Sequence, residues 1–520
     1  MFVASKTFST NVIIYSLFVW KNGIINMVED GEKMITINKN IQSEIIMTTM
    51  EEIVPKDSLF RKIDKYIDFT FIYDKVKDLY CENNGRPSVD PVVLFKIVFI
   101  QALEGIKSMR QTCKKIKVDA EYRWFLGIPY GTDTPHFSTF SKNYERRYKD
   151  TDIFEEIFVE IVNQAIKYNL VDGTTFYTDS THKKANANKN KYSDEIIKNV
   201  KERRKWLEEE INEERKKQGR KPFEYKDEEE GKHIKVSTTD KESGYYHRDN
   251  KEKGFMYLDH RTVDDKCNIT VDAYVTKGNV HDSVPFIERT EYIKKKFDFE
   301  IKKYAVDSGY LTLDIKKYFI DNDIFGVFGY RRYGTPESRK EKSKYKYDKD
   351  LDLYIEKTTG EVLKYAGLID KNGYKTYRNS DKTKIVRRHI REEWNEYFRD
   401  IRLSEEGKKL YQRRKEHVER SFADSKQNHG YRYAMYKGVE KNQHYTWLIC
   451  AAQNMKNIAI KNDNVGKKPL TLSLNIQKIV KLIINFKKSF MRKPLEKYLR
   501  VCLHSEKEKF WLLLFCFGFH

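Results

Sequence analysis

Residues 174–179 read TTFYTD, a run of β-branched and aromatic residues that stops at an acidic one. This composition favours a β-strand that ends at Asp179, because the following STHKK is polar and basic. Further strands alternate with helices along the chain, which indicates an α/β fold with a mixed sheet. The expected elements are strands at 255–263, 268–275, 303–306 and 325–329, and helices at 283–297 and 314–322.

The segment before this sheet has a helical pattern. From about residue 59 to residue 168, apolar runs recur at helical spacing between Gly and Pro breaks. Asp90 and Pro91 form a good N-cap and first-turn pair. The pattern fits a helix-turn-helix-like DNA reader and a plain helical bundle equally well.

Two insertions interrupt the expected sheet. Residues 193–231 are almost entirely charged, which predicts a long solvated helix or a hairpin. A second insertion spans 331–410, and its first part, 331–375, interleaves basic residues with tyrosines. Such a segment suits phosphate contact with base stacking, or it is a flexible surface loop. The residues concerned are Arg331, Arg332, Arg339, Lys340, Lys342, Lys344 and Lys346 with Tyr333, Tyr345 and Tyr347.

The charge balance favours a polyanionic partner. Lys and Arg total 99 against 78 acidic residues in 520, a net charge of +21. Nucleic acid is the first candidate for such a chain, although AT-rich codon usage also enriches Lys. The six cysteines are scattered without a CxxC pair, so the sequence predicts neither a zinc ribbon nor a disulfide framework, and a reducing cytosol fits.

Both ends of the chain are unusual. Residues 11–20, NVIIYSLFVW, resemble a weak signal-peptide core, but Met47 or Met50 is a more natural start. Residues 1–50 are therefore expected to be a non-native or disordered extension. Residues 510–517 are too short to cross a bilayer, so no membrane partner is expected. The tail 461–520 is basic and apolar, and it is expected to dock on the core and track DNA, with an anionic membrane as the alternative.

Three carboxylates suit phosphodiester chemistry. Two divalent cations ~3.5–4 Å apart can stabilise both the attacking and the leaving oxygen, and Mg²⁺ prefers carboxylate oxygens. Asp179 and Asp307 each end an expected strand, where α/β sheets usually place ligands, and Glu419 lies in the helical run 411–426. The basic residues expected to contact DNA around them are Lys183, Lys184, Arg414, Lys415 and Lys426.

Each carboxylate also has a structural interpretation. An Asp at a strand end is often a turn former or a helix cap, and Glu419 alone fits an intrahelical charge ladder. Neighbouring residues compete for the roles as well. Asp172 is expected in a turn, Glu416 lies one helical turn before Glu419, and the His281-Asp282 pair is expected to position the site or cap a helix.

Several motifs resemble insertion-sequence transposases of the DDE type, in the branch with an N-terminal helical transposase domain. They are GRPSVDPVVLFK, YTDSTHKKANANKNK, YAVDSGY, RRKEHVERSFADSKQNHGYRYAMYKGVEK and the stretch from STTDKESGYYHRDNK to GNVHDSVP. The resemblance covers about residues 50–460. It implies that Asp179, Asp307 and Glu419 are the catalytic triad, that each site holds two Mg²⁺ or Mn²⁺ ions, and that the core is ribonuclease H-like.

The implied organisation is an α/β, ribonuclease H-like mixed-sheet core with insertions, preceded by an all-helical domain. The helical DNA-end-binding domain is expected at 51–168, the catalytic domain at 169–460 and the tail at 461–520. The expected partners are the terminal inverted repeats and target DNA, bound by a homodimer or larger complex at the bacterial nucleoid. A stand-alone nuclease of the same fold and an inactive DNA-binding remnant are the alternatives.

The chain departs from the family pattern in two places. Relatives have Tyr seven residues and Arg four residues before the Glu, whereas Tyr411 and Arg414 lie one residue earlier and Gln412 and Lys415 hold the family positions. Lys426 matches the Lys seven residues after the Glu. Many relatives also carry clustered cysteines before the Glu, whereas this chain has none between Cys267 and Cys450, so no zinc is assigned.

Overall fold

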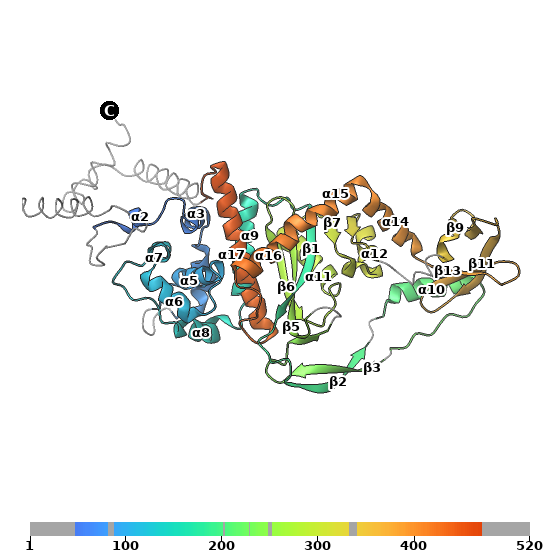
Figure 1. Ribbon diagram of the computed structural model, residues 1–520, viewed down its shortest axis with the longest axis horizontal. Coiled ribbons are helices and arrows are strands. Elements are labelled where there is room, and N and C mark those ends of the chain that lie inside the picture. The colour runs from blue at the N-terminus through green and yellow to red at the C-terminus, as the bar shows by residue number, and fades with distance from the viewer. Residues whose placement is uncertain are drawn as a thin grey trace, which may run out of the picture. The chain divides into compact units, whose positions relative to one another are not determined.

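The computed structural model describes residues 47–81, 88–200, 203–227, 229–247, 252–331 and 341–470 (Figure 1). The expected extension up to residue 46 and the expected basic tail from residue 471 lie outside the described residues, as do residues 332–340 of the second insertion. No helix among the described residues is long and apolar enough to cross a membrane.

The N-terminal region is helical, as the sequence predicts. Asp90 caps the helix Pro91–Leu103, because its carboxylate accepts the backbone N–H groups of Val92 and Val93 and Pro91 takes the first helical position. Ser58, Ser108 and Asp119 cap other helices in the same way. The elements are α2 Met50–Ile53, α3 Leu59–Tyr66, α4 Phe71–Val76, η1 Lys77–Leu79, α5 Pro91–Leu103, α6 Met109–Val118, α7 Ala120–Leu126, α8 Ser138–Asn143, η2 Tyr144–Tyr148 and α9 Ile153–Lys167.

A mixed sheet follows, which confirms the predicted fold class. Its strands lie in the order β4-β5-β1-β7-β8, with β6 also paired to β5. Only β5 runs against the other strands, since its pairs with β1, β4 and β6 are antiparallel and the pairs β1–β7 and β7–β8 are parallel. The strands are β1 Thr175–Lys184, β4 Gly244–Tyr246, β5 Gly254–Asp264, β6 Thr270–Lys277, β7 Lys303–Val306 and β8 Phe325–Phe328; between them lie α11 Phe286–Phe297, η3 Ser308–Tyr310 and α12 Leu313–Asp321.

The first strand is longer than the sequence predicts. Asp179 was expected to end it, but β1 continues to Lys184 because it stays paired with β5 as far as Lys184 opposite Met256. Its parallel pairing with β7 does stop early, at Thr178 opposite Val306. Asp179 is therefore the first residue beyond the parallel part of the strand, and not its last residue.

Helix α17, Val439–Val465, connects the helical region to the sheet. It packs against α3, α5 and α9 and also against β6 (Figure 1). One continuous hydrophobic cluster accordingly includes buried residues from Phe60 in α3 through Ile161 in α9 and Ala305 in β7 to Ile458 in α17. The helices and the sheet thus share a single core.

Amide side chains of α17 cover the backbone of the edge strand β6. Asn454 accepts the N–H of Thr270 at 2.9 Å and donates to its carbonyl at 2.8 Å. Gln443 accepts the N–H of Val275 at 2.6 Å and donates to the carbonyl of Ala273 at 2.8 Å. These contacts satisfy backbone groups that an edge strand would otherwise leave open.

The first insertion contains both of the structures that the sequence left open. Strands β2 Tyr192–Val200 and β3 Glu229–Ser237 form a two-stranded antiparallel sheet, and α10 Lys205–Lys217 lies between them in the chain. Helix α10 buries Leu207 and Ile211 in a small cluster with Ile369 of the second insertion.

The second insertion, for which the sequence left open a DNA-contacting segment or a flexible loop, forms an antiparallel sheet. Its strands lie in the order β13-β12-β11-β10-β9. Tyr345 is buried and Tyr347 packs against the same small core, so these two rings are not free to stack on bases. The strands are β9 Tyr345–Asp348, β10 Leu353–Glu356, β11 Val362–Ile369, β12 Tyr374–Arg378 and β13 Ile385–His389, and helices α14 Glu392–Leu403, α15 Glu405–Arg414 and α16 Arg420–Asn428 follow.

Candidate active site

The register of two parallel strands brings Asp179 and Asp307 together. Thr178 of β1 lies opposite Val306 of β7 in the last parallel pair, and each strand continues directly into an aspartate. Neighbouring strands lie about 4.8 Å apart, so the two carboxylates leave the same edge of the sheet side by side.

Burial and Asp307 both disfavour the charged form of Asp179. Burial raises the pKa of Asp179 to about 6, the charge of Asp307 adds to the rise, and the Arg414 guanidinium and the N–H of Ser180 oppose it. The Asp179 side chain is 19% exposed. The ionised form of this carboxylate is therefore unfavourable in the folded protein. Strongly shifted pKa values of this kind are common at functional sites.

Arg414 joins Glu419 to this pair. Its Nη1 lies 2.8 Å from Asp179 Oδ2, and its Nη2 donates to Glu419 Oε1 at 2.8 Å. We expected all three carboxylates to converge within reach of one metal ion, but no group of three His, Cys, Asp or Glu side chains in the described part of the chain is arranged to hold one. Two of the carboxylates converge on the Arg414 guanidinium, which neutralises their charge.

A π-helical turn explains why Tyr411 and Arg414 stand one residue early in the sequence. Residues Lys415–Glu419 form this turn between α15 and α16. A π turn accommodates one more residue than an α turn, so Arg414, five residues before Glu419, reaches the face that position four would occupy in an α-helix. Tyr411 is rotated in the same sense, and the charges of Asp307, Asp179 and Glu419 all act on its hydroxyl.

The π turn is anchored to β1 by a buried histidine. The His417 ring stacks on Tyr177, with centroids 4.8 Å apart and planes 5° from parallel. The Tyr177 hydroxyl donates to Asp265 Oδ1 at 2.5 Å. Burial lowers the pKa of His417, which favours the neutral ring in this stack. This stack fixes the π turn, which carries Glu419, against Tyr177, two residues before Asp179 in β1.

Asp282 is a fourth carboxylate close to the pair of aspartates. Its Oδ1 accepts the hydroxyl of Ser180 at 2.6 Å. A Cβ on Gly309 would lie 2.9 Å from Asp307 Oδ1 and 3.1 Å from Asp282 Oδ2, so the missing side chain leaves a cradle between the two carboxylates. Sequence reasoning gave the His281-Asp282 pair a positioning or capping role, and the contact with Ser180 fits positioning.

Tyr310 lies beneath these carboxylates, and sequence reasoning missed it. The residue is fully buried, and its hydroxyl has no hydrogen-bond partner among the described residues. Burial raises its pKa well above the usual range, and the charges of Asp179, Asp282 and Asp307 add to the rise. Asp179 and Asp282, whose charges act on Tyr310, lie far from it in the sequence, so no local pattern marks this residue.

The five basic residues assigned to DNA contact have different environments. Lys415 is exposed in the π turn, and Lys184 is half-exposed with an ion pair to Glu252 at 2.6 Å. Lys426 is half-buried and donates to Thr181 Oγ1 at 2.5 Å. Arg414 is mostly buried between the carboxylates.

Lys183 does not fit its assignment. It is completely buried, donates to the Tyr431 hydroxyl at 3.3 Å, and lies over the Tyr431 ring. Burial lowers its pKa to about 7. A side chain enclosed in this way cannot reach a DNA phosphate, so the prediction for Lys183 is wrong.

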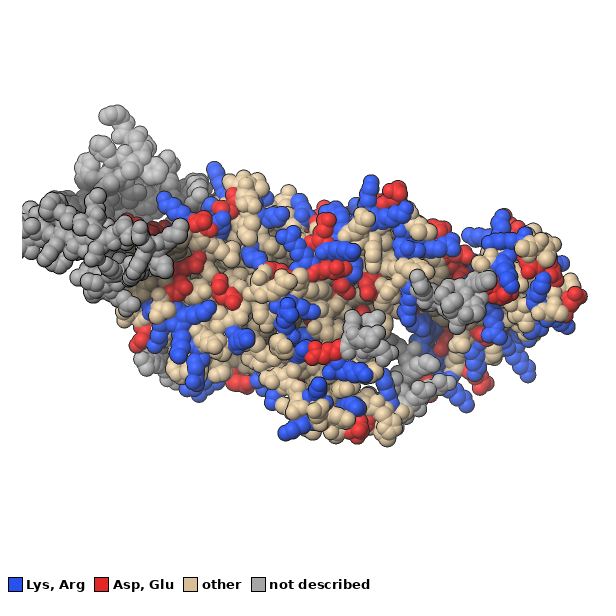
Figure 2. Space-filling model, viewed as in Figure 1, with Lys and Arg blue, Asp and Glu red and all other residues tan. Residues whose placement is uncertain are grey.

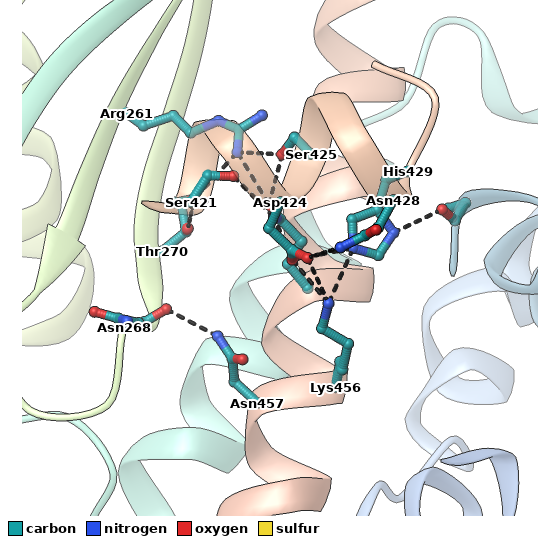
Figure 3. A network of polar contacts seen from close by, with 12 residues as sticks. Arg261, Asn268, Thr270, Ser421, Asp424, Ser425, Asn428, His429, Lys456 and Asn457 are labelled. Atoms are coloured by element: carbon teal, nitrogen blue, oxygen red, sulfur yellow. Dashed lines mark hydrogen bonds and ion pairs between the residues drawn. The ribbon is translucent and has the colours of Figure 1, made fainter. Parts of the chain in front are cut away.

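A buried polar network holds α16 between β5 and α17 (Figure 3). Arg261 of β5 donates to Asp259 Oδ2 at 2.9 Å and to Ser425 of α16 at 2.7 Å. Asp424 of α16 accepts from Lys456 of α17 at 2.7 Å. Burial alone would raise the pKa of Asp424, but hydrogen bonds from His429 and Lys456 hold it well below its usual range. This network fixes the helix that begins at Arg420, directly after Glu419.

The competing carboxylates lie apart from this arrangement. Asp172 is exposed and accepts a hydrogen bond from Thr174 in the turn before β1, as its structural interpretation predicts. Glu416 is exposed, and its backbone carbonyl accepts from Asn268 at 3.1 Å. Among the described residues, neither side chain forms a hydrogen bond or an ion pair with Asp179, Asp307 or Arg414.

Comparison with known proteins identifies the class. A family model described as a transposase domain matches residues 48–146, and one described as a transposase DDE domain matches residues 374–459, which include Glu419. No curated protein matches the chain. Among solved structures, the piggyBac transposase synaptic complex with hairpin DNA is similar at 10% identity, over 87% of this chain and 84% of that one, with a TM-score of 0.33. The two family matches support a DDE-type transposase.

Proposed function

We propose that Asp179, Asp307 and Glu419 are the catalytic carboxylates of this transposase. With them it would cleave DNA at the terminal inverted repeats of its element and join the freed 3′ ends to target DNA. The observation that carries the proposal is the strand register, which places Asp179 and Asp307 at adjacent positions while Arg414 contacts both Asp179 and Glu419.

The donor set fits Mg²⁺ or Mn²⁺. Carboxylate oxygens are the ligands that these hard cations prefer, and the cradle at Gly309 lies between the carboxylates of Asp307 and Asp282. Asp179, Asp307 and Glu419 would hold the cations, which we propose to be two per site. Bound cations of this kind stabilise the attacking and leaving oxygens of a phosphodiester.

The protein's own side chains would perform the remaining tasks. Arg414 keeps the carboxylates of Asp179 and Glu419 in position and neutralised. Lys184, Lys415 and Lys426 are exposed or half-exposed and would hold DNA phosphates by charge, independent of base sequence. Lys426 is already fixed against β1 by Thr181, so it loses little conformational entropy on binding.

The proposed reaction also implies an assembly and a location. Joining two element ends to one target requires both ends in a single complex, which a homodimer or larger assembly on DNA would provide. We place this work in the cytoplasm at the nucleoid, because DNA is the substrate. The net charge of +21 favours such an association.

The test separates catalysis from binding. Asp179→Asn and Asp307→Asn should each reduce Mg²⁺-dependent cleavage of terminal-repeat DNA by at least 10²-fold, because an amide is a poor cation ligand. Binding of the same DNA in EDTA should change less than about threefold, because phosphate contacts come from Lys and Arg. Asp172→Asn, an exposed neighbour outside the site, is the matched control and should cleave normally.

Two outcomes would contradict the proposal. Normal cleavage by either variant would remove that carboxylate from the catalytic set. Loss of binding and folding together, measured by circular dichroism, would show a structural role. An assay with paired ends and target DNA then separates a transposase, which joins strands, from a nuclease, which only cuts them.

A further inference from the structure

The five-stranded sheet of the second insertion has two faces with different chemistry. Side chains alternate between the faces along each strand, and one face buries Tyr345, Tyr354, Leu363, Tyr377 and Val386. The opposite face, here called the outer face, carries the basic residues Lys346, Lys364, Arg378 and Arg387.

Cations of the inner side are neutralised. Lys375 lies 3.3 Å from Glu214 of α10, and Arg388 pairs with Glu396 of α14 at 2.7 Å. The fold therefore supplies acidic partners to cations that it encloses, as burial of charge requires.

Cations of the outer face have no such partners. Lys346, Lys364, Arg378 and Arg387 make no ion pair with any acidic side chain in the described ranges, and Arg378 Nε is buried without a hydrogen bond there. Asp348 is the one acid that the described strands place on this face, and it accepts the N–H groups of Asp350 and Leu351 instead.

The register places two of these cations directly opposite each other. Lys364 of β11 pairs with Arg378 of β12, and Arg387 of β13 lies opposite Thr376, two residues from Arg378. Like charges at directly opposite positions destabilise a sheet. A bound anion would remove this repulsion, whereas the folded chain alone does not.

The area suits a polymer of phosphates better than a single small anion. The cations lie on β9, β11, β12 and β13, so they extend over four strand spacings, about 19 Å. A DNA strand places phosphates about every 3.4 Å along the axis, so several fall within this width. In Figure 2, Lys and Arg side chains are prominent over the part of the molecule that Figure 1 labels β9, β11 and β13.

We propose that the outer face binds the phosphate backbone of duplex DNA without reading its sequence. This inference rests on the proposed function, which makes DNA the substrate. It assigns that DNA a second contact surface, on the insertion that lies between Asp307 and Glu419 in the sequence. A second copy of this chain is a poorer occupant, because two such faces would repel each other.

The basic residues involved differ mostly from those that the sequence suggested. Lys342 pairs with Glu392 at 2.8 Å, and Lys344 pairs with Glu341 at 2.6 Å, so both are already neutralised. Among the candidates that the sequence named, Lys346 lies on the outer face, while Lys364, Arg378 and Arg387 are new.

The experiment compares two triple variants of the full chain. Lys364→Gln, Arg378→Gln and Arg387→Gln together remove three of the four cations of the outer face. Lys349→Gln, Lys371→Gln and Lys382→Gln make the same charge change at exposed residues in the turns of the same sheet. Duplex DNA binding is measured in EDTA between 50 and 200 mM salt, so that cleavage does not interfere.

The slope of log K against log salt is negative, and the outer-face triple should reduce its magnitude by about two to three, since each lost phosphate contact removes about 0.9. Its affinity should fall about tenfold or more equally for terminal-repeat and unrelated DNA, and the control triple should leave both quantities nearly unchanged. Lys364→Gln alone should lower the slope by about one, which covers the case that the triple fails to fold.

Three results would overturn the inference. The first is an unchanged slope, and the second is an equal loss in both triples, which would indicate general charge. The third is loss of self-association with intact DNA binding, which would assign the face to a second copy. An unchanged slope combined with loss of cleavage in Asp179→Asn would reject only this surface and leave the proposed function standing.

Discussion

Arg414 and Asp179 show how the site resolves a concentration of negative charge. The guanidinium makes ion pairs of 2.8 Å with both Asp179 and Glu419. Even with this partner, burial holds the pKa of Asp179 at about 6. A carboxylate that is costly to ionise in the folded protein is one that a bound cation would stabilise strongly.

The raised pKa gives a stability prediction. The folded protein binds the Asp179 proton more tightly than the unfolded chain does, so this group lowers stability as pH rises from about 4 to about 6, with the full cost above pH 6. Asp179→Asn removes the charge and should raise the free energy of unfolding by about 1–3 kcal/mol at pH 8, since each unit of pKa corresponds to 1.36 kcal/mol.

Urea unfolding in EDTA measures this difference. The gain should disappear below about pH 3.8, where Asp179 becomes protonated in the unfolded chain as well as in the folded protein. Asp172→Asn, at an exposed turn position, should change stability by less than about 0.5 kcal/mol at either pH. A destabilised Asp179→Asn at pH 8 would show that the ion pair with Arg414 outweighs the cost of burial.

The sequence predicted the positions of Asp179 and Asp307 in the fold better than that of Lys183. Asp179 and Asp307 were visible because each follows an apolar strand run. Lys183 was misassigned because the strand was expected to end at Asp179, so the alternation of faces was not continued to residues 180–184. Arg261 and Tyr310 depend on contacts between distant segments, which local pattern does not reveal.

At the scale of elements, the π turn Lys415–Glu419 reconciles the chain with its family pattern. Read as a regular helix, the sequence displaces Tyr411 and Arg414 from the face of Glu419. The extra residue in the turn returns Arg414 to that face, where it pairs with Glu419. Helix periodicity alone could not predict this, because π turns have no reliable sequence signal.

Two single deletions test the π turn. Deleting Lys415 should convert the turn to an α turn and leave Arg414 four residues before the Glu, on its face. The fold should then be retained, and cleavage at saturating DNA should be largely retained, because only the proposed phosphate contact of Lys415 is lost. Deleting Gln412, also exposed, rotates Tyr411 by about 100° away from the site and should reduce cleavage at least tenfold.

Cleavage rate and melting temperature are the measurements. Equal damage by the two deletions would contradict the role given to the π turn. Retained activity in the Gln412 deletion, together with lost activity in the Lys415 deletion, would show that the π turn does not orient Tyr411 and Arg414 as described.

The second insertion shows a different limit of sequence reasoning. Its basic and aromatic residues predicted contact with DNA or a loop, whereas the tyrosines form the core of a small sheet. Aromatic residues favour strands as well as base stacking, so composition could not separate the two. Only the strand register shows which cations share a face.

Across the whole molecule, one hydrophobic core and one polar network connect the parts that carry the carboxylates. Helix α17 packs on the N-terminal helices and bonds to β6 through Gln443 and Asn454. The network of Arg261 and Asp424 fixes α16 beside β5. The mixed sheet and the helical region were predictable from periodicity, but this shared core was not.

The most direct test of the account is to locate the cation. Fe²⁺ can replace Mg²⁺ at carboxylate sites, and with ascorbate and peroxide it cuts the backbone of the protein near the bound ion. The wild-type protein should give fragments cut near residues 179, 307 and 419, and excess Mg²⁺ should suppress them. Asp179→Asn should lose all three cuts. Cuts that map elsewhere, or that survive in Asp179→Asn, would contradict the assignment of these three carboxylates to one metal-binding active site.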